Sequence, residues 1–311
     1  MSGVEEATMV ERFRNSNLYL MLRVAFGLQL DSQEPEPQQV KIISAALAKS
    51  GTKSIKAALE MLGYRVYHGE DCASDDHVIA AQALMHKDGA FEEWMQSVQS
   101  RGYNATLDVP MAFFYEEMMQ MYPDAKVLLA TRSNSTTWAE SFIEQSQAFS
   151  PITGYPFYWL IPTWGDLVGP FSGGLQREMG CKFEQVWWNS TMFPWIRAVW
   201  DYKIDASECA RGIDAYVSKV REVVPKDRLI EMSVKDGWKP LCEGLGLPEP
   251  DVPFPRLNSR AEIVIGRNLL RGIAVAWPFL GILNLFLGFL LIRAVVRCLT
   301  GRTGHPKRKL E

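Results

Sequence analysis

Hydrophobic and polar positions along the chain follow two alternating periodicities. Short runs rich in β-branched or aromatic residues predict strands at 40–46, 64–68, 104–108, 125–131 and 228–234. Apolar residues at helical spacing predict helices near 54–62, 76–101, 112–122, 136–148, 184–201 and 206–224. Because strands alternate with helices, we expect an α/β fold with a parallel sheet covered by helices on both faces. Ligands of such sheets bind beyond the carboxyl ends of the strands.

The remaining segments divide the chain into one domain and its extensions. The predicted parts are an N-terminal extension (1–38), the domain (39–260), a linker (261–271), a transmembrane helix (272–292) and a basic tail (293–311). Within the domain, residues 149–182 are aromatic and rich in proline and glycine, which is typical of an irregular lid over an acceptor pocket or of a packed loop. We expect the proline-rich run 247–258 to wrap over the core.

The predicted transmembrane helix is uncharged from Gly272 to Ile292. At about 1.5 Å per residue it is roughly 31 Å long, close to the hydrocarbon thickness of a bilayer. Basic residues lie on both sides and favour a cytoplasmic tail slightly. Because we find no secretory signal before the domain, we expect a single-pass C-terminal membrane anchor with the domain facing the cytosol. We interpret the N-x-[ST] sequons at Asn104, Asn134 and Asn189 as chance matches.

Composition argues against several classes of protein. The formal net charge of −3 argues against broad nucleic-acid binding. Cysteines occur at positions 72, 181, 209, 242 and 298. Since no two of them form a C-x-x-C pair, we interpret them as reduced, mostly buried thiols and expect neither a disulfide framework nor a zinc site. No metal-ligand spacing is present, so we expect no metal.

The loop between the first predicted strand and helix is suited to an anion. The strand at 40–46, the small-residue turn at 48–52 and the helix that follows point free backbone N–H groups and a helix dipole at one place. Phosphate is the anion that such a place favours most. The loop also carries polar side chains that can bind oxygen, namely Lys49, Ser50, Thr52 and Ser54.

One alternative is a P-loop nucleotide triphosphatase. Its loop reads G-x-x-x-x-G-K-[ST], with the lysine directly after the second glycine. Here Thr52 separates Gly51 from Lys53, and Ala46 takes the place of the first glycine. In this alternative, Asp108 is the candidate to hold magnesium.

The motifs after the loop resemble those of the sulfotransferase-like P-loop family. The loop and helix read KSGTKSIKAALEMLG at 49–63. The other family elements are D-x-P at 108–110, YPDAKV…R…W…S at 122–141, G-W-x-P-L-C at 237–242 and P-F-P-R-x-N at 253–258. The resemblance spans roughly residues 40–260 in chain order, which is more specific than any single motif. The family often has glycine before the loop, where this chain has Ala46 and Ala48.

The resemblance implies that the loop binds 3′-phosphoadenosine 5′-phosphosulfate (PAPS), whose sulfuryl group passes to an acceptor hydroxyl. Lys49 would bind the bridging or sulfonate oxygens and stabilise the leaving phosphate. The backbone of Ser50, Gly51 and Thr52, together with the Thr52 and Ser54 hydroxyls, would hold the 5′-phosphate.

Two further elements complete the implied site. Arg132 and Ser141 would bind the 3′-phosphate that distinguishes PAPS from ATP, while we interpret Trp138 between them as a core residue. Asp108 stands two residues before Pro110, where cytosolic sulfotransferases carry a histidine as general base. A carboxylate can remove a hydroxyl proton. An aspartate after a strand also commonly caps the next helix, so both roles stay open.

The histidines and the implied partner say less about the function than the loop and the motifs do. We expect none of the four histidines to lie at a strand end with catalytic neighbours, although His68 is the nearest to the site. The implied partner is a small-molecule or lipophilic hydroxyl acceptor, with no nucleic acid. A non-enzymatic hypothesis, supported by Ala46 and Ala48, is a degenerate sulfotransferase-like binding or scaffold protein at a membrane.

Overall fold

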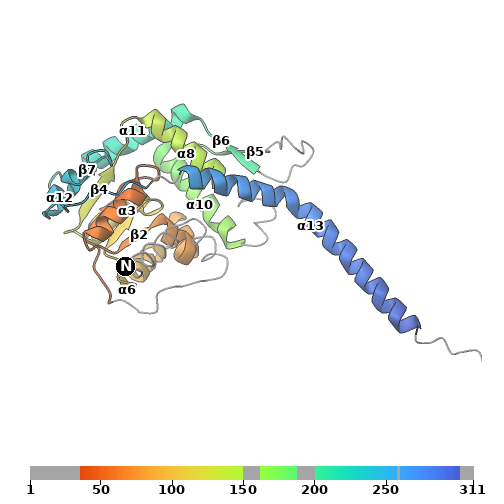
Figure 1. Ribbon diagram of the computed structural model, residues 1–311. Coiled ribbons are helices and arrows are strands. Elements are labelled where there is room, and N and C mark those ends of the chain that lie inside the picture. The colour runs from red at the N-terminus through yellow and green to blue at the C-terminus, as the bar shows by residue number, and fades with distance from the viewer. Residues whose placement is uncertain (1–35, 150–161, 188–199, 258–259, 302–311) are drawn as a thin grey trace, which may run out of the picture.

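Five short strands form one parallel sheet at the centre of the domain, in the order β2-β3-β1-β4-β7. The computed structural model describes residues 36–149, 162–187, 200–257 and 260–301. The strands are β1 (Ile42–Ser44), β2 (Val66–His68), β3 (Ala105–Leu107), β4 (Lys126–Ala130) and β7 (Leu229–Met232) (Figure 1). The predicted α/β fold with a parallel sheet is therefore confirmed.

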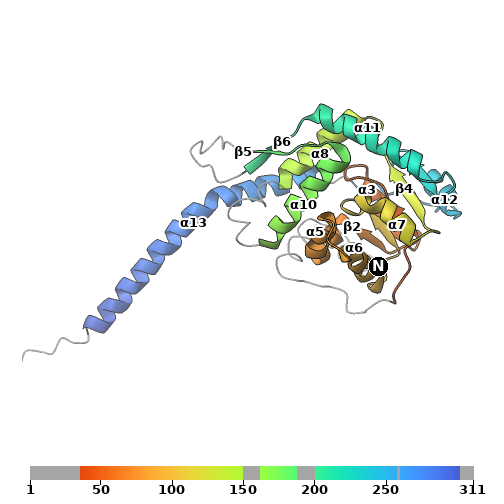
Figure 2. The same cartoon turned by 180° about the vertical axis from the view of Figure 1, so that it is seen from behind.

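The sheet separates two hydrophobic cores, because successive residues of a strand point to opposite faces. Ile42 and Leu128 face the core under α3 (Thr52–Met61) and α12 (Lys239–Leu245). Their neighbours Ile43 and Val127 face the other core. That core is covered by α5 (His77–Leu84), α6 (Ala90–Ser100), α7 (Tyr115–Met121), α8 (Ser135–Phe149), α10 (Pro162–Met179) and α11 (Ala206–Val223) (Figure 2). Burial on both faces is why the strands could be found as continuous apolar runs.

The helix predicted over 76–101 is broken in two. A π-helical turn (Cys72–Asp76) follows the short α4 (Gly69–Asp71) and leads into α5, and α6 begins only at Ala90. Between α5 and α6, His86 and Gly89 have positive φ angles of 54° and 74°, which an α-helix cannot accommodate. In the same way, the helix predicted near 112–122 begins as a 3-10 turn (Met111–Phe114) before α7.

Two other predictions were wrong for the described residues. Residues 162–179 of the segment we interpreted as irregular form α10, while 150–161 lie outside the described part of the chain. At the ends of the predicted helix 184–201, β5 (Glu184–Trp187) and β6 (Trp200–Lys203) pair as antiparallel strands. Their valine, tryptophan and tyrosine residues favour strands. Residues 188–199 are not among those described.

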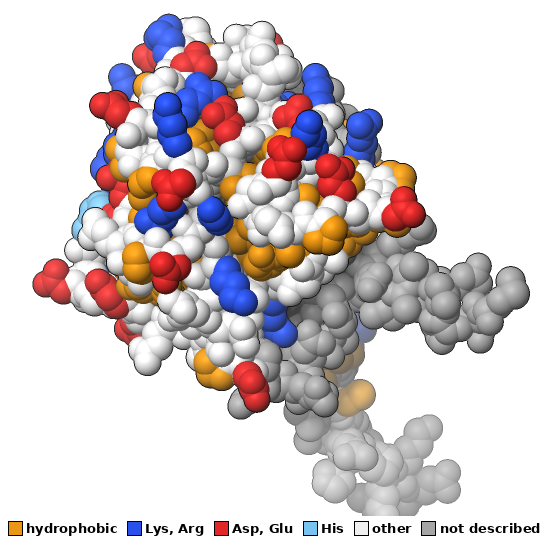
Figure 3. Space-filling model, turned by 90° about the vertical axis from the view of Figure 1, so that its left-hand side faces the viewer, with side chains coloured by type: hydrophobic (Ala, Val, Ile, Leu, Met, Phe, Trp, Pro, Cys, Tyr) orange, Lys and Arg blue, Asp and Glu red, His pale blue; other side chains and the backbone are white. Residues whose placement is uncertain are grey.

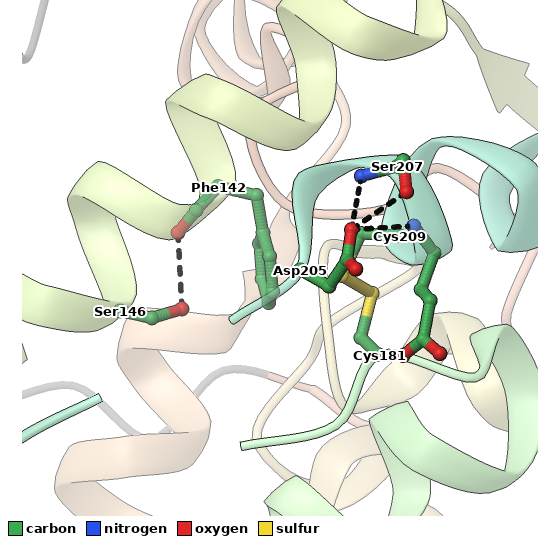
Figure 4. Close-up of a disulfide and its surroundings, with 7 residues drawn as sticks. Phe142, Ser146, Cys181, Asp205, Ser207 and Cys209 are labelled. Carbon is green, nitrogen blue, oxygen red and sulfur yellow. Dashed lines mark hydrogen bonds between the residues drawn. A yellow bond between two sulfur atoms is a disulfide. The ribbon is translucent and has the colours of Figure 1, made fainter. Parts of the chain in front are cut away.

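Cys181 and Cys209 form a disulfide, so our interpretation of all five cysteines as reduced thiols was wrong for this pair. The bond joins the residues after α10 to the first turns of α11, whose start is capped by Asp205 (Figure 4). These segments pack closely. A Cβ at Gly212 would lie 1.5 Å from the Met179 carbonyl oxygen. Sequence spacing could not show this pairing, because the contact depends on how α11 packs.

We expect the double change Cys181→Ser and Cys209→Ser to lower the free energy of unfolding by about 3.5 kcal/mol, from the loop-closure entropy of such a separation. The two cysteines are 28 residues apart in the sequence. Denaturant unfolding with and without reductant measures the effect, and the exposed Cys298→Ser is the matched control. If reductant lowers the stability of the double variant as much as that of the wild type, the disulfide does not contribute.

The C-terminal helix α13 (Arg260–Gly301) begins against α8 and projects away from the domain (Figures 1 and 2). The expected linker, 261–271, is helical and belongs to α13. Residues Val264–Cys298 have a mean hydropathy of 2.3 in their most apolar window, and none of that window is buried. The helix is therefore long and apolar enough to cross a membrane.

One face of the domain, on the left-hand side of Figure 1, carries charges of both signs (Figure 3). Lysine and arginine side chains are interspersed with aspartate and glutamate on it. This mixture agrees with the small net charge of −3. Seen from this side, the surface shows no broad area of one sign that would attract a polyanion.

Candidate functional site

The loop between β1 and α3 turns through two residues with left-handed backbone. The φ angle is 66° at Lys49 and 91° at Gly51. At Gly51 a Cβ atom would lie 2.5 Å from Cγ2 of Val234, so glycine is required by the backbone and by the available space. Lys49 is not a glycine, and residues other than glycine adopt this left-handed backbone conformation mainly at turns and functional sites.

The start of α3 presents backbone N–H groups toward this loop. Gly51 is the N-cap residue, no side chain caps the helix, and its first turn has no acidic residue. Ile55 N–H is the donor that closes the first turn, onto the Gly51 carbonyl. The N–H groups that precede it have no acceptor within the helix. Together with the helix dipole they favour an anion.

Lys49 and Arg132 lie beyond the carboxyl ends of neighbouring strands. Lys49 follows β1 and Arg132 follows β4, and these strands are paired with Ser44 opposite Leu128. Burial and the Arg132 guanidinium lower the pKa of the Lys49 ammonium, against the carboxylates of Glu144 and Asp108. These side chains are therefore close enough to influence one another, on the same edge of the sheet.

Arg132 and Ser141 are in direct contact. Nη1 of Arg132 donates a hydrogen bond to Ser141 Oγ at 2.7 Å and approaches the Thr137 carbonyl oxygen at 3.4 Å. The Arg132 side chain is exposed, so the rest of its donors can reach a ligand. A guanidinium held in this way can bind two phosphate oxygens at once.

Trp138 connects the same helix to the loop between β1 and α3. Only 2% of its surface is exposed, which confirms its interpretation as a core residue. Its Nε1 donates to the Ala48 carbonyl oxygen at 2.8 Å. Its ring stacks on Phe142, with ring centroids 5.0 Å apart. The helix that carries Ser141 is thus fixed to the loop that carries Lys49.

We expect Arg132→Ala to weaken binding of 3′,5′-adenosine bisphosphate about tenfold or more, from the loss of charge-assisted hydrogen bonds. Isothermal titration calorimetry measures the affinity. Arg132→Lys keeps the charge but not the planar fork and should recover part of the loss. Equal affinities for the wild type and Arg132→Ala would exclude Arg132 from the nucleotide site.

Asp108 follows β3 in a left-handed conformation, with a φ of 74°. Its Oδ1 accepts from the Val109 N–H at 2.8 Å, and its Oδ2 accepts from Thr52 Oγ1 at 3.2 Å. The next helical turn starts after Pro110 and has no side-chain cap, so the capping role was wrong. Burial raises the pKa of the Asp108 carboxyl, against the effects of the His68 ring and of these two donors.

His68 is the last residue of β2, and it lies against Asp108. Its Nε2 is 3.2 Å from Asp108 Oδ2, although the two atoms are not aligned as a hydrogen bond. Our expectation that no histidine ends a strand beside a catalytic candidate was wrong. Strands β2 and β3 are neighbours, with His68 opposite Leu107, so both chains leave the sheet together. Gly69 permits the approach, because a Cβ there would lie 2.3 Å from the Val109 carbonyl oxygen.

The loop hydroxyls have partners of their own. Thr52 is buried and uses its one hydroxyl proton on Asp108. Ser54 Oγ accepts from the Leu257 N–H at 2.9 Å and so ties the proline-rich segment to α3. Phe254 of that segment is buried in the core under α3. The Thr52 hydroxyl proton is therefore used within the protein, while Ser54 still has its own proton to donate.

Two residues near the site were missed from the sequence. His68 could have been found as the polar end of an alternating strand. Glu144 lies three residues after Ser141, on the same side of α8, and a helical-spacing argument could have placed it near Arg132. The sequence-predicted residues that meet at one edge of the sheet are Lys49, Ser50, Gly51, Thr52, Asp108, Arg132 and Ser141.

Comparison with known proteins gives the family of this chain. The family model described as a sulfotransferase domain matches residues 41–263. A curated protein of Aspergillus versicolor, "Ava biosynthesis cluster protein M", is 28% identical over 235 residues, which cover 70% of this chain and 80% of that protein. Since the family model covers most of the chain, including β1 to β7 of the sheet, this chain belongs to the sulfotransferase domain family.

Proposed function

We propose that this protein is a membrane-anchored sulfotransferase that moves a sulfuryl group from PAPS to the hydroxyl of a small or lipophilic acceptor. The observation that carries the proposal is the pairing of two anion-binding groups on neighbouring strands. One is Lys49 with the uncapped start of α3, and the other is Arg132 with Ser141. A nucleotide with phosphates on both its 5′ and 3′ positions has the chemistry to engage both.

In this proposal each residue has one task. The backbone N–H groups of Gly51 and Thr52 bind the 5′-phosphate, and Lys49 binds the bridging or sulfonate oxygens. The Ser50 N–H donates to the Leu47 carbonyl oxygen at 3.2 Å and is left out. Arg132 binds the 3′-phosphate, with Ser141 orienting its guanidinium. We leave the Thr52 hydroxyl out of the phosphate site, because its proton goes to Asp108. The Ser54 hydroxyl accepts from the Leu257 N–H and keeps its own proton for the 5′-phosphate. None of these contacts requires a metal ion.

The transfer itself requires positioning and charge stabilisation. The acceptor oxygen forms a bond to sulfur while the bond between sulfur and the bridging oxygen breaks. The electron pair of that bond stays on the 5′-phosphate, which leaves as 3′,5′-adenosine bisphosphate. Lys49 neutralises the charge that develops there, and Asp108 accepts the hydroxyl proton. The relative from Aspergillus versicolor is named for a biosynthesis cluster, which supports a small-molecule acceptor.

A thermal-shift titration tests the nucleotide. We expect 3′,5′-adenosine bisphosphate to raise the melting temperature of the full-length protein and ATP with Mg²⁺ to have no such effect. Stabilisation by ATP with Mg²⁺ alone would favour the triphosphatase. No stabilisation by either would favour the degenerate binding or scaffold protein, for which Ala46 and Ala48 remain the argument. Transfer of labelled sulfate from PAPS to membrane extracts then identifies the acceptor class.

We further propose that α13 anchors the protein with its domain in the cytosol, a reducing compartment in which Cys181 and Cys209 would be kept as thiols although the fold brings them within bonding distance. Of the three sequons, Asn104 and Asn134 use their side-chain oxygens within the fold, accepting from Arg65 N at 2.9 Å and Thr136 N at 2.7 Å. Because a glycan would be attached through Nδ2, these contacts of the side-chain oxygens do not bear on our interpretation of the two sequons as chance matches. Protease treatment of intact microsomes should digest the domain. Its protection, or a Cys181–Cys209 disulfide formed in living cells, would favour the opposite orientation.

A further inference from the structure

The two ring nitrogens of His68 have different surroundings. The side chain is buried, with 2% of its surface exposed. Nδ1 accepts a hydrogen bond from the Glu70 backbone N–H at 3.3 Å. A neutral imidazole whose Nδ1 is an acceptor carries its proton on Nε2. Within the described residues that Nε2 has no hydrogen-bond partner, and it lies 3.2 Å from Asp108 Oδ2.

This arrangement excludes His68 as the group that receives the acceptor's proton. The lone pair of Nδ1 is taken by a backbone N–H, and Nε2 already carries its own proton. A buried donor without a partner is costly, and Asp108 Oδ2 is the acceptor within reach. Hydrogen bonds of catalytic groups are often misaligned before the substrate binds. A small rotation of the carboxylate would align this one.

We propose that His68 is a positioning residue, whose Nε2–H holds the Asp108 carboxylate so that Oδ1 receives the acceptor's proton. The inference rests on the proposed function, since it assigns a role within that site. Its basis is a count of lone pairs. A carboxylate offers about four, two on each oxygen. Thr52 and His68 approach Oδ2 and the Val109 N–H takes one place on Oδ1, which leaves one place on Oδ1.

The proton balance follows from that count. The acceptor's hydroxyl proton moves to Asp108 Oδ1 as its oxygen bonds to sulfur, and the electron pair of the broken S–O bond leaves with the 5′-phosphate. Asp108 then gives the proton to solvent. His68 takes no part in this transfer: its Nε2–H donates to the carboxylate throughout.

Other charged groups face this pair and must be considered in any test by pH. Glu70, on the turn after β2, lies near His68 and forms an ion pair with Lys53 at 2.6 Å. Although burial acts to raise the pKa of Glu70, His68 and Lys53 lower it overall. Lys49 approaches Asp108 from the β1 loop. Glu70→Gln is therefore a matched control, because it removes a neighbouring charge and leaves the His68 Nε2–H in place.

The tautomer can be observed directly in the full-length protein in detergent micelles. The chain has four histidines, so spectra of protein labelled with ¹⁵N-histidine are simple, and the His68→Gln variant assigns the His68 signals. We expect a proton on Nε2 at neutral pH, and a change in the Nε2 signal when Asp108 is replaced by Asn. A proton on Nδ1, or a His68 signal indifferent to Asp108→Asn, overturns the proposal.

The pH dependence of kcat/KM separates positioning from a purely structural role. Turnover is measured as release of labelled sulfate from PAPS to water or to 4-nitrophenol. We expect His68→Leu to shift the acid limb of the kcat/KM profile to higher pH by about one unit. The reason is that loss of the Nε2–H donor raises the pKa of the Asp108 carboxyl. His68→Gln, which keeps an N–H near the Nε2 position, should restore the limb, and Glu70→Gln should not move it upward.

Other outcomes have distinct meanings. An acid limb that stays in place in His68→Leu overturns the positioning role, even if that variant melts earlier. Binding of 3′,5′-adenosine bisphosphate is followed separately by thermal shift. If the wild type does not bind it, the proposed function fails, whereas the histidine spectrum still reports whether His68 donates to Asp108.

Discussion

Replacing Lys49 by alanine is expected to lower kcat at least about a hundredfold, which is the effect of removing one preorganised group that stabilises charge in a transition state. Lys49 follows β1 in the left-handed conformation that turns the loop toward α3. Its burial removes water from the ammonium and lowers its pKa. A partly desolvated charge interacts more strongly with the leaving phosphate than one in bulk water. Rapid-quench measurement of a single turnover on PAPS measures the chemical step.

Lys53→Ala is the matched control for this experiment. Lys53 lies on the first turn of α3, four residues after Lys49, and its Nζ is paired with Glu70 at 2.6 Å. Removing it takes away one nearby positive charge but no proposed contact with the nucleotide. We expect a change in kcat of a few-fold at most. Equal losses in Lys49→Ala and Lys53→Ala would mean that general electrostatics, not a specific contact of Lys49, accounts for the effect.

Asp108→Asn is expected to lower turnover by about 10² to 10⁴, the range for loss of a general base, and to leave the affinity for 3′,5′-adenosine bisphosphate close to that of the wild type. An amide keeps the shape of the carboxylate and can still accept from Thr52, but it cannot take up a proton. Turnover on PAPS and calorimetric titration of the nucleotide measure the two effects. Unchanged turnover would remove Asp108 from the mechanism.

The same variant should change how stability depends on pH, with a defined sign. Burial raises the pKa of Asp108 above its ordinary value of 3.8. At pH values between 3.8 and the raised pKa of the native state, the native state binds more protons than the unfolded state. The free energy of unfolding therefore falls as the pH rises through this range. Asparagine lacks this titration. Denaturant unfolding from pH 3.8 upward should therefore show a shallower fall of stability with pH in Asp108→Asn than in the wild type. An equally steep fall in the variant would contradict a raised pKa of Asp108.

The sheet and half of the site could be predicted from the chain because they depend on local pattern. Residues 127–130 of β4 are buried, with side chains in the cores on both faces of the sheet, so this part of the strand is an unbroken apolar run. Lys49 and Arg132 each follow a strand, and parallel strands end at one edge, so their neighbourhood followed from sequence order. The strands β5 and β6 were mistaken for a helix, because short aromatic runs do not distinguish the two periodicities.

The contact between His68 and Asp108 could not be predicted, because it depends on strand order. β3 lies between β1 and β2, so the second strand of the chain pairs with the third and not with the first. Periodicity carries no information about which crossover places which strand at the edge. The Cys181–Cys209 bond has the same origin, since only the packing of α11 on α10 brings its two ends together.

The continuity of α13 has a mechanical consequence. With 42 residues at about 1.5 Å each, it is roughly 63 Å long, about twice the hydrocarbon thickness of a bilayer. Leu270, on its first part, is 5% exposed, and the helix packs on α8, which also carries Ser141. In the proposed anchoring, this one continuous helix, which bends as it leaves the domain (Figures 1 and 2), would set the height and tilt of the domain above the lipid. An acceptor dissolved in that lipid would then meet Lys49 and Arg132 at an elevation that α13 determines.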